Sequence, residues 1–278
     1  MKGNWLLHRV PRITTTVLVT VVLLACATVV NAAGEKLDDR WHFTITPFVW
    51  LPYLSATDKL ESPPDFPSGE LETGPGNYLQ YLDFVGMLDL QVQKGRWSLL
   101  ADVVYVDFSG NQRASFPGIL AADGGWTIGA DWGLKALILE FAGAYSVFRN
   151  KYLNFDLLAG ARYAGIDGKV ALDISGPLPA WVLSRTFSET AGFVDPIIGF
   201  KGKFEPGRKW YFPYYFDIGG FGVGSDLTLH AHAGIGFRFC DWFSMALGYR
   251  YLYYDFGENK LVNDLKLYGA TLGLSFSF

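Results

Sequence analysis

The sequence predicts a closed antiparallel β-barrel that crosses a lipid bilayer, and three observations support this fold class. The final stretch, Asp264–Phe278, alternates at period two between an apolar face and a face of glycine, serine and threonine. The chain is 50% hydrophobic and 17% aromatic, yet no apolar run after residue 32 is long enough for a membrane helix. Similar alternation recurs along the chain between short turns. Strands with lipid on one side and a wet lumen on the other have this pattern.

We expect about ten strands, with short turns at the periplasmic end and long loops at the outer end; eight or twelve strands also fit. The expected strands cover residues 41–53, 83–93, 97–108, 132–148, 152–165, 193–204, 209–221, 226–239, 242–256 and 264–278. Residues 54–80 and 109–130 are expected as loops, and 166–192 as a hairpin beyond the membrane. Pro47 has no amide hydrogen, so the first strand is expected to be irregular there.

Outward aromatic residues fall into two groups, as the two interfaces of a membrane require. One group lies near the short turns and consists of Trp97, Trp210, Phe243 and Phe278; the other lies near the loops and consists of Tyr105, Tyr163, Tyr251 and Tyr253. A secreted β-sandwich or lipocalin-like barrel would bury the apolar face instead. It would then expose Arg162, Arg250 and Asp217 and fill its core with tyrosine and tryptophan, so we disfavour it.

Residues 1–32 read as a secretory signal peptide, which leaves residues 33–278 as the barrel. Basic residues precede the apolar run from Val17 to Val30, and small residues before Ala33 offer a cleavage site. A retained membrane anchor is the alternative. The stretch before Cys26 also resembles a lipoprotein processing site, which would leave Cys26 lipidated.

Charge and cysteine content exclude several classes of site. Removal of the signal peptide takes away three positive charges and changes the formal charge from −4 to −7. An acidic chain lacks the basic footprint that nucleic acid requires. Only Cys240 would remain, which excludes an intramolecular disulfide and a zinc site built from several cysteines.

A ten-stranded barrel is narrow, so inward charges must pair with one another. The residues expected to form this lumen network are Asp102, Glu140, Arg162, Asp195, Asp217, His230, His232 and Arg250. Counting back from the turns places Asp217 about opposite His232, Asp195 beside Asp217, and Arg250 beside His230 or His232, each within about one pleat repeat. These residues would then share one layer of the lumen.

The network has three interpretations. It could plug and stiffen the barrel, or form a charged constriction that selects small solutes or ions. Paired acids beside a histidine could also activate water, as in the ten-stranded omptin proteases, but no motif of theirs matches and the layer is expected near mid-membrane. His230 and His232 share a face without a clear third metal ligand. We therefore expect no catalytic residues, metal or cofactor.

The whole expected mature chain resembles the Gram-negative bacterial outer-membrane β-barrel proteins. Gly248-Tyr249-Arg250-Tyr251 resembles uncharacterised porin-like members, and Phe278 with Phe276 and Leu274 resembles the signal that the barrel assembly machinery reads. The resemblance implies export through the periplasm to the outer membrane, contact with its lipid and lipopolysaccharide, and porin-like passage of small solutes or ions. The alternatives are a plugged barrel that binds or adheres through its extracellular loops and, less favoured, an outer-membrane hydrolase.

Overall fold

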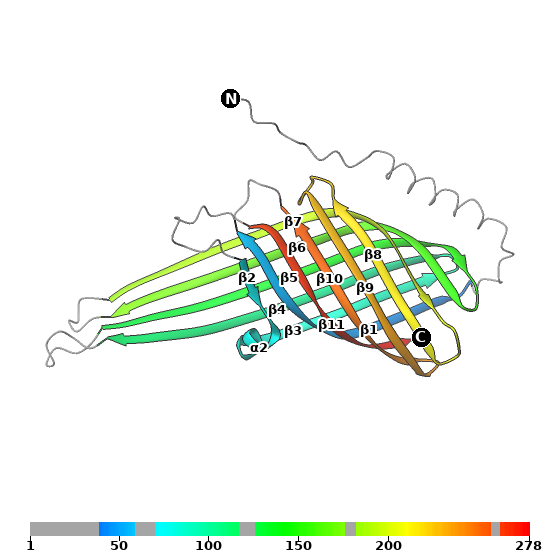
Figure 1. The fold of residues 1–278 in the computed structure, drawn as a ribbon, viewed down its shortest axis with the longest axis horizontal. Helices are drawn as coiled ribbons and strands as arrows, with labels where there is room; N and C mark the ends of the chain where they lie inside the picture. Colours follow the sequence, from blue (N-terminus) through cyan, green and yellow to red (C-terminus); the bar gives the residue numbers. More distant parts are fainter. Residues whose placement is uncertain (1–38, 59–69, 117–125, 176–181, 257–261) are drawn as a thin grey trace, which may run out of the picture.

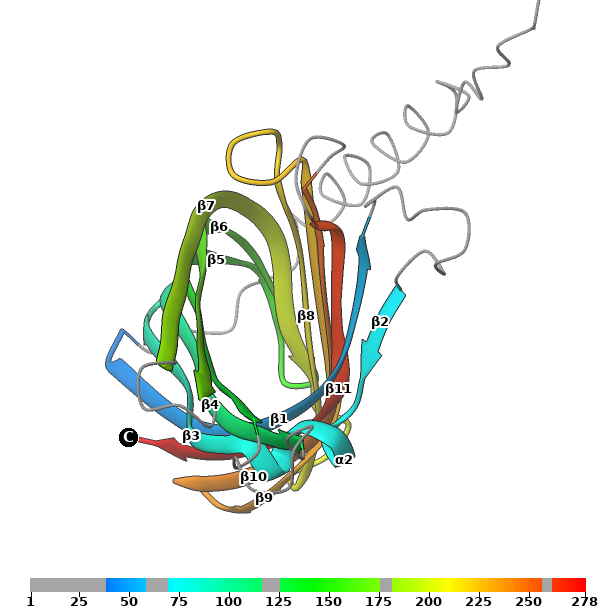
Figure 2. The same ribbon diagram turned by 90° about the vertical axis from the view of Figure 1, so that its left-hand side faces the viewer.

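The computed structural model describes residues 39–58, 70–116, 126–175, 182–256 and 262–278. The predicted signal peptide, with Cys26, lies outside these residues, as do parts of the expected outer loops. Figure 1 shows the strands wound around one axis, and Figure 2 shows them enclosing a lumen. Among the described residues, neither short helix has the length or hydrophobicity to span a membrane.

The described strands form one antiparallel sheet in which each strand pairs with its neighbour in the chain, apart from the short β2, and β11 pairs with β1 to close the barrel. The strands are β1 (Trp41–Asp58), β2 (Glu70–Thr73), β3 (Leu82–Lys94), β4 (Trp97–Phe116), β5 (Trp126–Arg149), β6 (Leu153–Ser175), β7 (Val182–Phe204), β8 (Trp210–Gly220), β9 (Leu227–Cys240), β10 (Phe243–Asp255) and β11 (Val262–Ser277). Of the 11 strands, β2 pairs with β1 alone, so ten strands make the wall. The predicted fold class is confirmed.

Residues that alternate in polarity along each strand point alternately to the outside of the barrel and into its lumen. Outward side chains are apolar and exposed, as with Leu99 (66% exposed) and Leu247 (62%). Leu100, next to Leu99, and Arg250, further along the strand of Leu247, point inward and are buried. At the seam, the Phe278 amide donates to the Phe43 carbonyl (2.8 Å) and the Phe278 carbonyl accepts from the Phe43 amide (3.1 Å), so these two residues close the wall. An apolar outer surface around a polar lumen is the arrangement of a transmembrane barrel.

Four strands are longer than the alternation alone predicted. A transmembrane strand needs about 9–11 residues, whereas β4 to β7 have 20, 24, 23 and 23. Figure 1 shows them reaching past the other strands. We call this projecting part, residues 107–116, 126–135, 167–175 and 182–190, the extracellular sheet. Residues 109–116 and 126–130 were expected as loop and are strand, because the two strands pair to Phe116–Trp126 and support each other outside the membrane.

The wall is irregular between β1 and β3. The ladder covers Trp41–Pro47 of β1 against Lys94–Leu88 of β3 and stops there, at the proline that predicted an irregularity. Beyond the stop, β1 pairs through Leu54–Thr57 with β2, and the chain returns to β3 through α2 (Pro75–Tyr78) and η1 (Leu79–Tyr81). Residues 54–80 were expected as a polar loop, so this part of the prediction is wrong for residues 54–58 and 70–80.

Candidate functional site

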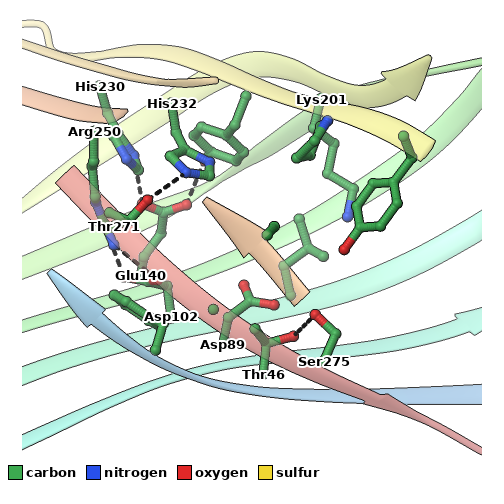
Figure 3. A pocket seen from close by; sticks show the side chains of 17 residues that line it. Thr46, Asp89, Asp102, Glu140, Lys201, His230, His232, Arg250, Thr271 and Ser275 are labelled. Atoms are coloured by element: carbon green, nitrogen blue, oxygen red, sulfur yellow. Dashed lines mark hydrogen bonds and ion pairs between the residues drawn. The ribbon is translucent and has the colours of Figure 1, made fainter. Parts of the chain in front are cut away.

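The periplasmic half of the lumen contains two overlapping cavities. One has a volume of about 240 Å³ and reaches Asp102, Glu140, His230 and Arg250. The other has about 330 Å³ and extends to Cys240 and other residues at the short-turn end. Figure 3 shows charged and polar side chains from several strands pointing into the first cavity. Both cavities share Asp89, Lys201 and His232, so they form one polar vestibule that ends at the charged layer.

A fully buried ion network lies at the inner end of the vestibule. Arg162 donates to Glu140 Oε2 through Nε (3.0 Å) and Nη2 (2.7 Å), and Nη2 also pairs with Asp217 Oδ2. His230 Nδ1 lies 3.1 Å from Arg162 Nη2 and 3.2 Å from Asp217 Oδ2. Tyr215 donates its hydroxyl to Glu140 Oε1. Since Arg162 and Asp217 have no exposed surface, these charges depend on one another.

A second ion pair crosses the lumen beside this network. Arg250 on β10 donates to both carboxylate oxygens of Asp102 on β4, over 3.1 Å and 2.8 Å. The guanidinium also lies over the Trp50 ring, 5.0 Å from its centroid. A bidentate pair fixes both side chains and is stronger than a single hydrogen bond. Together with the Arg162 network, it joins strands from opposite sides of the wall.

Glycines on the inward faces make room for these side chains. A Cβ on Gly199, opposite Asp217, would lie 2.1 Å from the Phe216 carbonyl oxygen and 2.8 Å from Asp217 Cβ. A Cβ on Gly248 would lie 2.5 Å from His232 Nε2, the atom that is 3.1 Å from Thr271 Oγ1. Small residues therefore set where the polar groups meet. Tyr215 was missed as a member of the network, although its inward position in the alternation was visible.

The structure brings most of the predicted residues together and corrects their register. Arg250 lies opposite His232, as predicted. Asp217 lies opposite His230 and is offset from His232 by one pleat repeat, which is within the precision of the prediction. The reason is the turn between β8 and β9, where Gly220, Phe221 and Gly222 all have positive φ and shift the returning strand. A turn of this shape could not be counted from residue spacing.

Asp195 does not join the network, and its predicted place beside Asp217 is wrong. Gly199 is the residue opposite Asp217 on β7, because the turn from β7 to β8 spans more residues than a tight hairpin. Asp195 instead accepts hydrogen bonds from the amides of Gly224 (3.1 Å) and Ser225 (2.8 Å) and from the Ser225 hydroxyl (2.8 Å). It therefore holds the β8–β9 turn over the barrel.

Replacing Asp195 with alanine is expected to destabilise the barrel by about 1–3 kcal/mol, because buried donors of the turn lose their acceptor. The measurement is the urea midpoint of the refolded protein in vesicles, followed by tryptophan fluorescence. Asp241→Ala, in the exposed β9–β10 turn, is the matched control and is expected to leave the midpoint unchanged. Equal midpoints for the two variants would contradict this role of Asp195.

Three members of the network, Glu140, Asp217 and His230, have ligand atoms close enough to hold a metal ion, within 4.8 Å of one another. However, Arg162 Nη2 already contacts all three side chains. A second cation in the same place would be repelled by the guanidinium. The arrangement therefore fits an internal ion pair and gives no support to a metal centre.

The extracellular half of the lumen is apolar. The buried cluster there consists of Trp50, Met87, Val104, Ile138, Ala164, Leu252, Tyr254 and Leu267. Leu252 has no exposed surface and Trp50 has 2%. Side chains packed in this way leave little room for a column of water. The lumen thus changes from a polar vestibule, through a charged layer, to a packed apolar cluster.

Comparisons with known proteins agree with this architecture. No protein-family model matches the chain, and no curated protein matches it. Among solved structures, the outer membrane protease OmpT from Escherichia coli aligns over 88% of this chain and 99% of its own, with a TM-score of 0.51 and 10% identity. The translocator domain of autotransporter NalP from Neisseria meningitidis covers 95% of this chain and 96% of its own, with a TM-score of 0.42 and 12% identity.

At 10% identity the likeness to OmpT concerns the fold alone. This likeness supports the same fold as three features of the structure itself: the closed antiparallel wall, the apolar outer surface and the short turns at one end. These features place the chain in the outer membrane, where closed barrels satisfy every strand edge. The chain has the fold of the Gram-negative outer-membrane β-barrel proteins.

Proposed function

We propose that this protein is a plugged, non-enzymatic outer-membrane barrel that binds apolar ligands at the cell surface through its extracellular sheet. The observation that carries the proposal is the amphipathic character of that sheet. Trp132, Val170 and Phe187 lie directly opposite one another on three neighbouring strands, so they share one face. Val170 is 40% exposed and Phe187 is 56% exposed.

The other face of the extracellular sheet is polar. Asp107, Lys135, Asp167 and Thr190 form a cross-strand row at its base, with Lys135 Nζ 2.9 Å from Asp107 Oδ2. The apolar face continues along β6 through Ala164 into the apolar half of the lumen. A four-stranded sheet with one polar face, and with Val170 and Phe187 exposed on the other face beside Arg185 and Glu189, is suited to binding a ligand on that second face.

Passage of small solutes or ions is the second candidate, and the polar vestibule favours it. The vestibule is lined by charges of both signs and lies at the periplasmic end. Passage would require the charged layer and the apolar cluster to separate. The buried pairing of Arg162 and the packing around Leu252 oppose that separation.

Single-channel conductance distinguishes the two candidates. The refolded mature barrel in a planar bilayer is expected to give no discrete steps, because the apolar cluster excludes water and ions. Heat-modifiable gel mobility serves as the control that the refolded barrel is folded. Discrete steps in the wild type, with an ion selectivity altered by Arg250→Ala, would contradict the plugged barrel and identify the Asp102–Arg250 layer as the constriction of a channel.

A further inference from the structure

The ladder between β1 and β3 is interrupted, and we call the stretch without backbone pairing, Phe48–Pro52 of β1 and Phe84–Met87 of β3, the slit. If the register of Pro47 with Leu88 continued, Phe48 would lie opposite Met87 and Trp50 opposite Val85, but these residues do not pair. The other edges of both strands are fully paired here, β1 with β11 and β3 with β4. An open strand edge in lipid costs several kcal/mol for each unsatisfied group. A slit at this depth therefore needs a physical explanation.

The sequence supplies substitutes for the missing backbone bonds. The Trp50 amide donates to Met87 Sδ (3.1 Å) in place of a carbonyl. The Pro52 carbonyl accepts from the Tyr78 hydroxyl of α2 (2.7 Å), and Pro52 itself has no amide hydrogen to leave unpaired. Proline and side-chain partners at an edge prevent strand pairing. The slit is thus part of the fold of these strands.

The slit lies between the lipid-facing surface of the barrel and the apolar half of the lumen. Its outer lips are apolar and exposed, with Val49 at 49% and Phe84 at 58%. Its inner side is formed by Trp50 and Met87, which pack against Val104 and the rest of the buried cluster. It lies next to Tyr53, which stacks on Tyr268 (5.8 Å), and Tyr268 in turn stacks on Tyr251 of the aromatic group near the loops. It therefore faces the acyl chains of the outer leaflet.

Two buried hydrogen-bond donors in the apolar cluster indicate what kind of molecule would enter this half of the lumen. The Trp50 indole N–H and the Tyr254 hydroxyl have no hydrogen-bond partner among the described residues. Trp50 is 2% exposed and Tyr254 is 1% exposed. Buried donors without an acceptor are unfavourable. An acyl chain that carries an ester carbonyl or hydroxyl oxygen would supply apolar contact and an acceptor together.

We propose that the slit between β1 and β3 admits one acyl chain of an outer-leaflet lipid into the apolar half of the lumen, between Trp50 and Met87. The thioether of Met87 is flexible and polarisable, so it can move aside and repack around a chain. This inference concerns the barrel wall and does not rest on the binding role of the extracellular sheet.

Photolabelling in vesicles tests the proposal on one strand. The full mature barrel is refolded with a phospholipid whose acyl chain carries a diazirine, irradiated, and mapped by mass spectrometry. Phe141 faces the lipid and is expected to be labelled in any folded barrel. Ile138, in the apolar half of the lumen, is expected to be labelled through the slit, whereas Ala142, on the same inner face beyond the charged layer, is expected to stay unlabelled.

Met87→Trp, which adds bulk at the slit, is expected to reduce labelling of Ile138 to background while Phe141 stays labelled. Label on Phe141 but not on Ile138 in the wild type would overturn the proposal. This outcome is measured on the wild type alone and does not depend on whether Met87→Trp folds. Label on Ile138 from a free fatty acid with the same diazirine, but not from the phospholipid, would overturn it as well, because the acyl chain would then not come from a membrane lipid.

Discussion

Replacing Arg162 with methionine is expected to lower the free energy of unfolding by about 3–5 kcal/mol, the usual cost of breaking a buried ion pair. Methionine keeps most of the apolar volume but leaves Glu140 and Asp217 with buried, uncompensated charge. The measurement is urea unfolding of the refolded barrel in lipid vesicles, with tryptophan fluorescence as the signal and heat-modifiable mobility as the test of folding.

Two further variants separate charge pairing from other effects at this position. Arg208→Met in the exposed β7–β8 turn removes the same charge without burial and is expected to unfold with the wild type. Adding Glu140→Gln and Asp217→Asn to Arg162→Met is expected to recover much of the loss, because no buried charge remains unpaired. If Arg162→Met and Arg208→Met unfold at the same urea concentration, the network does not stabilise the barrel.

Removing the extracellular sheet is expected to abolish binding of apolar ligands while the barrel still folds. Residues 109–133 and 169–188 are replaced by Asn-Gly turns, which keeps the pairs Phe108–Leu134 and Gly168–Glu189 at the cut ends. Apart from β2, each strand pairs with its neighbour in the chain, so shortening the two hairpins also removes the outer pairs of the β5–β6 ladder but leaves the remaining ladders intact. Fluorescence of 1-anilinonaphthalene-8-sulfonate, an anionic probe that binds apolar surfaces, is compared with that of matched vesicles without protein.

Point variants in the full-length sheet assign this binding to one face. Phe187→Ser is expected to weaken probe binding about tenfold or more, since burying a phenylalanine side chain is worth about 1.5–3 kcal/mol. Thr186→Ala, the neighbour on the polar face, is the control and is expected to bind as the wild type does. Unchanged binding in the shortened barrel would contradict the proposed role of the sheet, whatever the outcome of photolabelling at the slit.

The sequence by itself determined the fold class and the face of each strand, because alternation at period two is a local property. Leu247, Arg250 and Phe276 could be assigned to lipid or lumen from their neighbours alone. Pro47 similarly predicted an irregular first strand. The network was predictable as a set of inward charges, since a narrow lumen requires Glu140, Arg162 and Asp217 to find partners.

Only the tertiary structure decided which inward groups meet. The positive φ values at Gly220, Phe221 and Gly222 set the register of β9, in which Asp217 lies opposite His230 rather than His232. The pairing of Asp102 with Arg250 depends on closure of the barrel, because the two residues face each other across the lumen from strands far apart in the chain. The slit at Trp50 likewise arises only when β1 closes against β11 and separates from β3. Register and closure are long-range properties, and residue spacing does not specify them.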